Sequence, residues 1–339
     1  MSIIVVGIDL AKNVFAVHGV NETGRPELVK PRVSREQLLP LIASLPPCLI
    51  GMEACSGAHH WARQFQALGH TVRLMAPKFV APYRLSGKRG KNDANDAAAI
   101  CEAVTRPAMR FVPVKDEHQQ STLCLHRTRQ GFVQERTAAY NRLRGLISEF
   151  GIVLPLKVER LRREILPHLE ALPGWARRCA NDLLAHASLL DARISEYDDA
   201  IRQISREDSR ARALAALPGI GPLSASALVA SLGAGHDFKN GRQVAAWLGL
   251  VPGQYSSGGK TRLGRITKAG DAYLRSLLLM GARAILASVG EKQDRFSRWV
   301  RELVARRGYW KAAVAIAAKN ARLAWAALHY GDEFRLTRS

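Results

Sequence analysis

The first thirty-odd residues of the chain consist of short apolar runs separated by polar turns. The run IIVVGI at residues 3–8 is continuous and mostly β-branched, which predicts a buried strand. Residues 13–20 and 28–33 predict two more strands, separated by the glycine-containing turn NETGRP. Three strands without a helix between them indicate an antiparallel meander.

Helices and strands alternate in the segment that follows. Ser34, with Gln37 three residues later, has the spacing of a capping box and predicts the start of a helix. CLIGMEA at residues 48–54 predicts a fourth strand, a helix ending at Gly69 comes next, and HTVRLMAP at residues 70–77 predicts a fifth. A meander followed by crossovers is the order of the ribonuclease H fold, with a mixed five-stranded sheet.

The pattern changes after the fifth strand, from mixed α/β to helical. Residues 116–150 contain no proline and many charges, which predicts one long helix paired with a second around residues 179–207. Mixed signs and low net charge favour a helical hairpin or coiled-coil arm. We therefore expect three domains: an α/β domain at residues 1–114, a helical arm at 115–207 and a mostly helical domain at 208–339.

One turn in the last domain carries a specific signal. In AALPGIGPLSASALVASLG a helix is expected to end near Leu217, followed by a turn and a helix of small residues. Gly219 and Gly221 would let backbone N–H groups approach a phosphate at the start of that helix. This pattern is typical of helix-hairpin-helix contacts with the DNA backbone. The alternative is an ordinary turn between packed helices.

The charge of the chain points to a polyanionic partner. The 339 residues carry a net charge of +21, with an isoelectric point near 10.4. Residues 208–339 hold 21 basic and 8 acidic side chains, so this domain is the main basic surface. Arginine, which suits bidentate phosphate contacts, accounts for 37 of the 50 basic residues. A basic surface kept only for solubility is the alternative.

Cysteine usage and hydropathy narrow the class of protein further. The five cysteines show no CxxC spacing, so neither a zinc site nor a disulfide framework is predicted. The N-terminal segment has no basic n-region or cleavage site, and no apolar stretch is long enough to cross a bilayer. We expect a cytoplasmic protein in a reducing compartment, without a membrane role. The cysteines are Cys48, Cys55, Cys101, Cys124 and Cys179.

Four carboxylates occur in contexts that suggest metal binding. Asp9 and Glu53 each end an apolar run that predicts a buried strand, and Asp93 and Asp96 stand three apart at the start of an alanine-rich helix. Burying an unpaired charge is costly, so acids placed there usually hold a cation. Mg²⁺ prefers oxygen ligands, and Mg²⁺ held by carboxylates can stabilise both oxygens of a phosphodiester displacement. Taken singly, Asp9 could be a turn residue and Asp93 a helix N-cap.

A second candidate site lies in GQYSSGGKTRLGRITKAGDAYLR, at residues 253–275. A serine hydroxyl in this loop could attack a phosphate and form a phosphoserine, which would retain the phosphodiester bond energy. No general base is apparent nearby, and a flexible solvated linker is the alternative for SSGG. The basic residues that would hold the phosphate follow closely and are Lys260, Arg262, Arg265 and Lys268.

Six segments together resemble one known family. GIDLAK, GMEACSG, KNDANDA, LPGIGPLSA, AAWLGLVPGQYSSGGK and ITKAGDAYLR are similar, in this order and over nearly the whole length, to DEDD-type transposases of the IS one-ten insertion-sequence family. The resemblance implies an N-terminal RuvC-like domain of ribonuclease H fold, a coiled-coil arm and a C-terminal transposase domain. Such proteins excise and insert their element as DNA recombinases.

The resemblance also implies roles for individual residues and partners. The DEDD acids would be Asp9, Glu53, Asp93 and Asp96, binding Mg²⁺, with Mn²⁺ as an alternative ion. Ser257 is the better match to the family's catalytic serine and Ser256 is the reserve. The implied partners are the DNA of element ends and target, other copies of the chain in a dimer or tetramer, and, for some members, an element-encoded guide RNA. A nucleoid-associated location is expected.

Two other functions stay open on the sequence alone. One is a RuvC-like nuclease of the junction-resolving type, in which a metal-activated water would replace the serine. The other is a non-enzymatic nucleic-acid-binding protein whose acids are structural. A covalent DNA–protein adduct separates the first from the recombinase, and absence of any cleavage with Mg²⁺ or Mn²⁺ would indicate the second.

Overall fold

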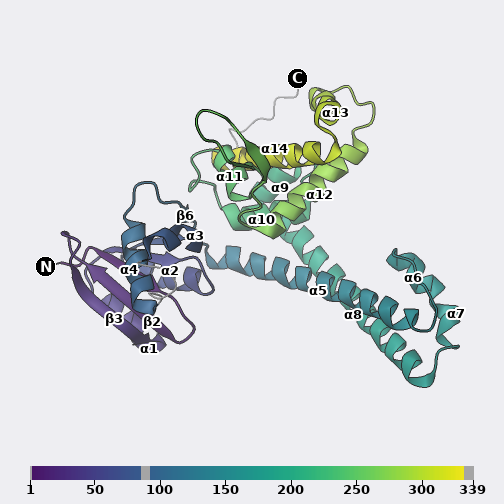
Figure 1. Cartoon of the computed structure of the whole chain (residues 1–339), viewed down its shortest axis with the longest axis horizontal. Helices are drawn as coiled ribbons and strands as arrows, with labels where there is room; N and C mark the ends of the chain where they lie inside the picture. Colours follow the sequence, from purple (N-terminus) through teal and green to yellow (C-terminus); the bar gives the residue numbers. More distant parts are fainter. Residues whose placement is uncertain (1, 85–91, 332–339) are drawn as a thin grey trace. The chain divides into compact units, whose positions relative to one another are not determined.

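The chain folds into two compact units, residues 1–117 and 118–339, shown in a computed structural model that describes residues 2–84 and 92–331 (Figure 1). The first unit is a mixed sheet with helices. Its elements are β1 (Val5–Asp9), β2 (Val14–Val20), β3 (Pro26–Ser34), α1 (Arg35–Ala43), β4 (Leu49–Glu53), α2 (Ala58–Ala67), β5 (Thr71–Met75), α3 (Pro77–Val80), the 3-10 turn η1 (Ala81–Tyr83), α4 (Asp93–Val104) and β6 (Phe111–Val112).

The sheet has the order β3-β2-β1-β4-β5-β6. β1, β4 and β5 are parallel to one another, whereas β2, β3 and β6 run antiparallel to their neighbours. All five predicted strands are present, and their order is consistent with the predicted ribonuclease H fold. The short sixth strand was not predicted, because two residues carry no readable periodicity.

The helix that starts after Ser34 confirms the capping box. The Gln37 backbone N–H donates to Ser34 Oγ at 3.3 Å, and the Ser34 backbone N–H donates to Gln37 Oε1, also at 3.3 Å. This reciprocal pair satisfies two of the orphan donors at the start of α1.

Each face of the sheet packs against different helices. Val6 and Ile8 of β1 belong to the core that includes side chains of α1 and α2, whereas Val5 belongs to the core that includes α4. Because side chains alternate along a strand, the positions of Val5, Gly7 and Asp9 share the α4 face.

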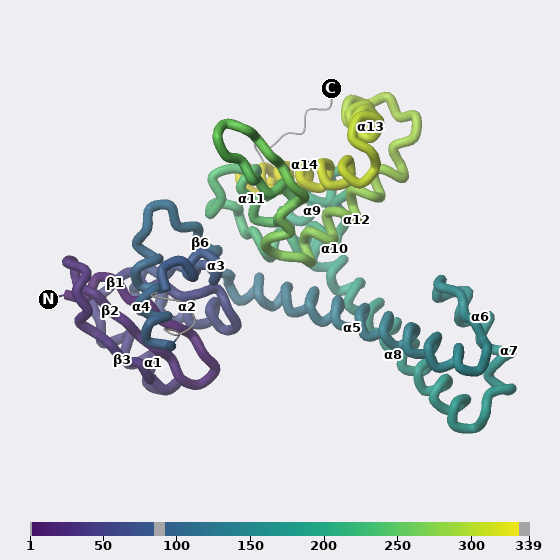
Figure 2. Tube along the Cα trace, in the orientation of Figure 1, coloured from purple at the N-terminus to yellow at the C-terminus, as the bar shows by residue number. Residues whose placement is uncertain are grey.

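The second unit is almost entirely helical (Figure 2). Its elements are α5 (Glu117–Ser148), α6 (Val158–Glu164), α7 (Leu166–Leu169), α8 (Gly174–Glu207), α9 (Ser209–Ala215), α10 (Pro222–Leu232), α11 (Gly241–Trp247), β7 (Pro252–Gln254), β8 (Leu263–Ile266), α12 (Ala272–Ser288), α13 (Arg295–Arg307) and α14 (Tyr309–Tyr330). The apolar core of its C-terminal part draws on α9 to α14.

The long helices α5 and α8 run side by side in opposite directions. The Arg129 guanidinium donates to both carboxylate oxygens of Asp198, at 2.6 and 3.1 Å. About two helical turns further along α5, Arg136 donates to Asp191 Oδ1 at 2.7 Å. As the residue number rises along α5, the partner's number falls along α8, so the two helices are antiparallel.

A buried histidine fastens α5 to the C-terminal helices. His126 is 1% exposed, and its ring nitrogens lie 3.0 Å from Tyr273 Oη and 3.0 Å from Ser226 Oγ. Because Ser226 Oγ donates to the Pro222 carbonyl, it accepts from His126 Nε2–H, which leaves Nδ1 to accept from the tyrosine. Burial, followed by the charge of Arg129, lowers the pKa of His126 to about 4 and keeps the ring neutral.

Candidate active site

The sheet places Asp9 and Glu53 at the carboxyl ends of two neighbouring strands. Asp9 is the last residue of β1 and Glu53 the last of β4, and these strands are parallel neighbours in which Ile8 is opposite Met52. The two acids therefore follow this pair at adjacent carboxyl ends, where open α/β sheets bind their ligands. In β4, Gly51 faces α4, so by alternation Glu53 lies on the same face as Asp9.

Two glycines let α4 cross this face closely. A Cβ on Gly7 would lie 2.2 Å from the Ala97 carbonyl oxygen, and one on Gly51 would lie 2.8 Å from Val104 Cβ. Gly7 and Gly51 are directly opposite in the register of β1 and β4. Because neither position carries a side chain, the backbone of α4 can pack directly against the sheet.

The first turn of α4 carries the other two acids. Asn92 is the N-cap, and its side chain accepts from the Asn95 backbone N–H at 2.8 Å. The alternative role of Asp93 as an N-cap is therefore wrong, because Asn92 takes it. Asp93 and Asp96 both lie inside the helix, and Asp96 is nearly buried.

The charges of the other three acids act on Asp9. The pKa of Asp9 is raised to about 6, first by burial and then by the charges of Asp96, Asp93 and Glu53. The positive charge of Arg84 opposes this rise. A carboxylate whose anion is disfavoured by its neighbours gains from any cation placed among them.

Arg84 supplies a positive charge that the sequence did not reveal. Its guanidinium lies 3.1 Å from Glu53 Oε1 and 2.9 Å from Asp96 Oδ1, so it bridges acids of a strand and a helix. The side chains of Glu53 and Asp96 are only 14% and 8% exposed. Arginine at a chain position without periodic context gives no sequence signal, which is why it was missed.

The acid set fits a hard divalent cation by its chemistry. All four donors are carboxylates, the ligand type that Mg²⁺ and Mn²⁺ take. Asp96 Oδ1 is buried, and within residues 2–84 and 92–331 its contact with Arg84 Nε lacks hydrogen-bond geometry, leaving the oxygen unsatisfied. In the same described residues, no three His, Cys, Asp or Glu side chains are close enough to form a metal cluster. The four acids therefore lie in one region, but no three of them converge on a single metal position in the described residues.

The serine loop is a β-hairpin rather than a flexible linker. β7 and β8 pair antiparallel, and the Lys260 backbone N–H donates to the Ser257 carbonyl at 3.0 Å. The two residues between them, Gly258 and Gly259, have φ values of 54° and 75°. Positive φ at both central positions is typical of a tight type I′ turn, which explains the glycine pair.

The hairpin distinguishes the two serines. Ser256 Oγ accepts from the Arg262 backbone N–H at 3.2 Å and from Gln254 Nε2 at 3.0 Å, so it holds the loop together. Ser257 is exposed at the turn and pairs with Lys260 across the strands. By alternation, Ser257 shares one face of the hairpin with Lys260 and Arg262, whereas Ser256 belongs to the opposite face.

The remaining basic residues of this segment flank the hairpin. Arg265 lies in β8. Lys268 follows the strand in a left-handed conformation, with φ of 53°, and its backbone N–H donates to the Gly249 carbonyl at 3.1 Å. Both side chains are exposed.

The turn of the predicted helix-hairpin-helix segment lies between α9 and α10, and its two glycines differ. Gly219 faces inward, where a Cβ would lie 2.6 Å from Ile285 Cδ1 of α12. Gly221 is the N-cap of α10, with no side-chain cap and nothing within 4 Å of a Cβ position. Asn320 is fully buried and donates to the Pro218 carbonyl at 2.8 Å, which fixes the turn. Packing accounts for Gly219, whereas Gly221 remains open to a phosphate.

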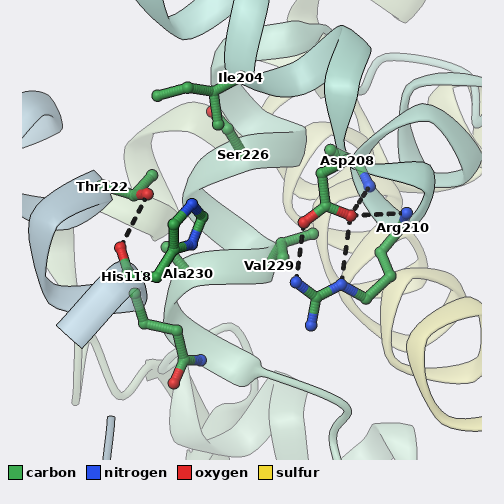
Figure 3. Close-up of a pocket in the computed structure, with 10 residues that line it drawn as sticks. His118, Thr122, Ile204, Asp208, Arg210, Ser226, Val229 and Ala230 are labelled. Atoms are coloured by element: carbon green, nitrogen blue, oxygen red, sulfur yellow. Dashed lines mark hydrogen bonds and ion pairs between the residues drawn. The ribbon is translucent and has the colours of Figure 1, made fainter. Parts of the chain in front are cut away.

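Two cavities among the described residues lie apart from these sites. A pocket of about 10 Å³ lies among α5, α8, α9 and α10, beside His118 and Asp208 (Figure 3), and has room for about one water molecule. A hollow of about 470 Å³ near Ile4, Pro47 and Thr71 lies at the opposite ends of the parallel strands from the acids, and its lining carries no charged side chain.

Within the described residues, no helix is long and apolar enough to cross a membrane.

Comparison with known proteins identifies the family. The profile of the DEDD transposase family of IS110 matches residues 6–152, and that of the transposase IS116/IS110/IS902 family matches residues 211–298. A probable family 20 transposase of Pseudomonas aeruginosa is 47% identical, over 95% of this chain and 96% of its own. The transposases for insertion sequence elements IS1328 of Yersinia enterocolitica and IS1111A of Coxiella burnetii are each 39% identical, over 98% of this chain and 99% and 91% of theirs. The chain thus belongs to the IS110 (IS one-ten) family of DNA transposases, whose DEDD domain suggests a requirement for a divalent metal.

Proposed function

We propose that this transposase cuts and rejoins DNA through a phosphoserine intermediate formed by Ser257, with the four acids holding Mg²⁺ or Mn²⁺ at the scissile phosphate. The observation that carries the proposal is the position of Asp9 and Glu53 at adjacent strand ends beside Asp93 and Asp96 of α4, where burial and then the charges of the other three acids raise the pKa of Asp9 to about 6. Arg84 bridges only two of the four acids, Glu53 and Asp96, so the set as a whole still favours a further cation.

The divalent ion, when bound, would polarise the phosphate and stabilise the attacking and leaving oxygens. Asp9 and Glu53, at the ends of β1 and β4, would supply ligands fixed by the sheet. Asp93 and Asp96 would add ligands from α4, whose position is set by Gly7 and Gly51. Arg84 would balance the acids when no metal is bound.

The serine chemistry conserves the number of phosphodiester bonds. Ser257 Oγ forms a bond to phosphorus while the bond from phosphorus to one sugar oxygen breaks, and the serine proton ends on that oxygen. Attack by a DNA hydroxyl reverses these steps and releases the serine, so no ATP is required. Ser257 is favoured over Ser256 because it shares a face with Lys260 and Arg262, whereas Ser256 Oγ already accepts two hydrogen bonds.

The partners follow from the charge. The exposed Lys260, Arg262, Arg265 and Lys268, together with the open N-terminus of α10 at Gly221, would hold the DNA backbone. Binding should therefore weaken with salt, with a logarithmic slope of about −0.9 for each neutralised phosphate. Assembly into a dimer or tetramer, use of an element-encoded guide RNA and a place at the nucleoid remain proposals.

Trapping the intermediate tests the proposal. The full-length protein is incubated with labelled element-end DNA and Mg²⁺, with the guide RNA if the element encodes one, and then denatured. We expect an adduct with the wild type and with Ser256→Ala, and none with Ser257→Ala. Cleavage without any adduct in the wild type would instead indicate hydrolysis by water, as in a junction-resolving nuclease.

A further inference from the structure

A tyrosine beside the candidate nucleophile is exposed in an unusual way. Tyr255 is 76% exposed, although its backbone N–H is fixed by a bond to the Arg262 carbonyl at 2.9 Å. A large aromatic ring contributes to stability mainly through burial, so this ring contributes little to the fold.

The ring lies across two glycines. A Cβ on Gly264 would lie 3.0 Å from Tyr255 Cε2, and one on Gly253 would lie 3.7 Å from the same atom. One glycine belongs to β7 and the other to β8, so the ring spans both strands of the hairpin. A methyl group at Gly264 would crowd the ring and make it shift. The hairpin therefore seats one side of the ring on backbone and leaves the other side to solvent.

Two other strongly exposed aromatic rings of this unit have partners. Trp310 packs edge-to-face with Tyr309 and lies under the Arg283 guanidinium, 5.8 Å from its carbon, and Trp175 pairs with Arg178. Among the described residues, Tyr255 has no ring or cation partner, and its hydroxyl makes no hydrogen bond. Its free side is unoccupied by the protein itself.

The surroundings of the ring suit nucleic acid. Strand alternation places Tyr255 and Ser257 on one face of the first strand, with Arg262 and Lys260 opposite them. Two residues along a strand span about 6–7 Å, so the backbones of Tyr255 and Ser257 are near each other, and the ring leans from Tyr255 toward Gly253 and Gly264, away from the serine. An aromatic platform beside cations that follow a phosphate backbone is the arrangement by which proteins hold single strands.

We propose that the free side of the Tyr255 ring stacks on an unpaired nucleobase of the DNA strand that Ser257 attacks, while Lys260 and Arg262 contact its phosphates. The nature of the occupant rests on the proposed function. The role of the tyrosine is to bind an unpaired base of the attacked strand a short distance along the hairpin from the scissile phosphate, and it needs the ring but not the hydroxyl.

Equilibrium binding of the full-length protein to single-stranded and blunt duplex DNA of equal length tests this assignment. Tyr255→Ala should weaken single-strand binding about 5- to 150-fold, the range that stacking of one base supplies. Duplex binding should change less than about twofold. Tyr255→Phe and Tyr255→Trp should bind as the wild type does. Equal losses on both DNAs, or a loss with Tyr255→Phe, would overturn the proposal.

Salt dependence separates stacking from phosphate contact. For single-stranded DNA, the slope of log K against log[salt] should be unchanged in Tyr255→Ala, because no phosphate contact is lost, but its magnitude should fall by about 0.7 in Arg262→Ala. A changed slope in Tyr255→Ala would show that the ring acts through the cations, against the proposal.

The two glycines provide a matched pair of controls. Gly264→Ala should reduce single-strand binding, though less than Tyr255→Ala does, because the new methyl group pushes the ring from its position on the hairpin. Gly253→Ala, whose methyl group would make ordinary contact, should bind normally. Equal behaviour of the two variants would contradict a seated ring.

Failure of this proposal is distinguishable from failure of the proposed function. The first is measured by binding alone, without metal or cleavage, whereas the second is measured by the phosphoserine adduct. An effect of the ring on oligouridylate with none on single-stranded DNA would assign Tyr255 to RNA and overturn the DNA assignment. A wild type that does not bind single strands would also overturn it.

Discussion

The acid set and the serine hairpin are built in opposite ways. Asp9 and Glu53 end buried strands, and α4 presses on their face through Gly7 and Gly51. Ser257 instead occupies the exposed turn of a two-stranded hairpin. Mutually repelling charges must be held in place by a rigid scaffold, because their own interactions push them apart. A neutral hydroxyl needs only to be presented, so a short hairpin is sufficient.

The largest expected effect comes from removing one acid charge. Asp9→Asn should lower DNA cleavage by at least about 10²–10³-fold, the usual loss when one group that stabilises transition-state charge is removed. DNA binding should stay largely intact, because the basic residues of the second unit are unchanged. Cleavage assays and binding isotherms on the same preparation measure both. Equal losses of binding and cleavage would contradict the assigned role.

Packing sensitivity sharpens the contrast between the two regions. Gly7→Ala should destabilise the first unit by about 3 kcal/mol or more, because its methyl group would lie 2.2 Å from the Ala97 carbonyl oxygen. Gly253→Ala in the hairpin should change stability by less than about 0.5 kcal/mol. Denaturant unfolding measures both variants. Similar costs at the two positions would break the comparison.

The smallest effect is expected from removing Arg84, the positive charge between Glu53 and Asp96. Arg84→Ala should lower the stability of the metal-free protein by about 1–3 kcal/mol, because two nearly buried carboxylates lose a charged partner. Added Mn²⁺ should then raise the melting temperature of Arg84→Ala more than that of the wild type. Arg84→Lys, which keeps the charge, should fall between the two. An unchanged response of Arg84→Ala to Mn²⁺ would separate the arginine from the acid set.

The sequence predicted the first unit well, since burial leaves a strong pattern. β1 and β4 read as apolar runs, and the Ser34 capping box was visible as a local spacing, so the acids could be placed at strand ends. The sequence did not predict that Asn92 would cap α4, because Asn92 and Asp93 are both good caps and only the position of the helix decides between them.

The hairpin could not be predicted in the same way. SSGG has the composition of both a flexible linker and a type I′ turn, and pairing across eight residues decides which one forms. The contrast between Ser256 and Ser257 depends on strand alternation, which exists only once the register is known. Arg84 was missed because its partner Asp96 lies in another element of the chain. Tyr255 was missed because its partner Gly264 has no side chain that would indicate a contact.

Identification of the residue that carries DNA tests the account most directly. The denatured adduct is trimmed with nuclease and protease, and the peptide containing residues 255–260 is fragmented by mass spectrometry. The account predicts a nucleotide on Ser257 in the wild type and no modified peptide in Asp9→Asn. A nucleotide on Ser256 or on another residue, or an unmodified peptide after efficient cleavage, would contradict it.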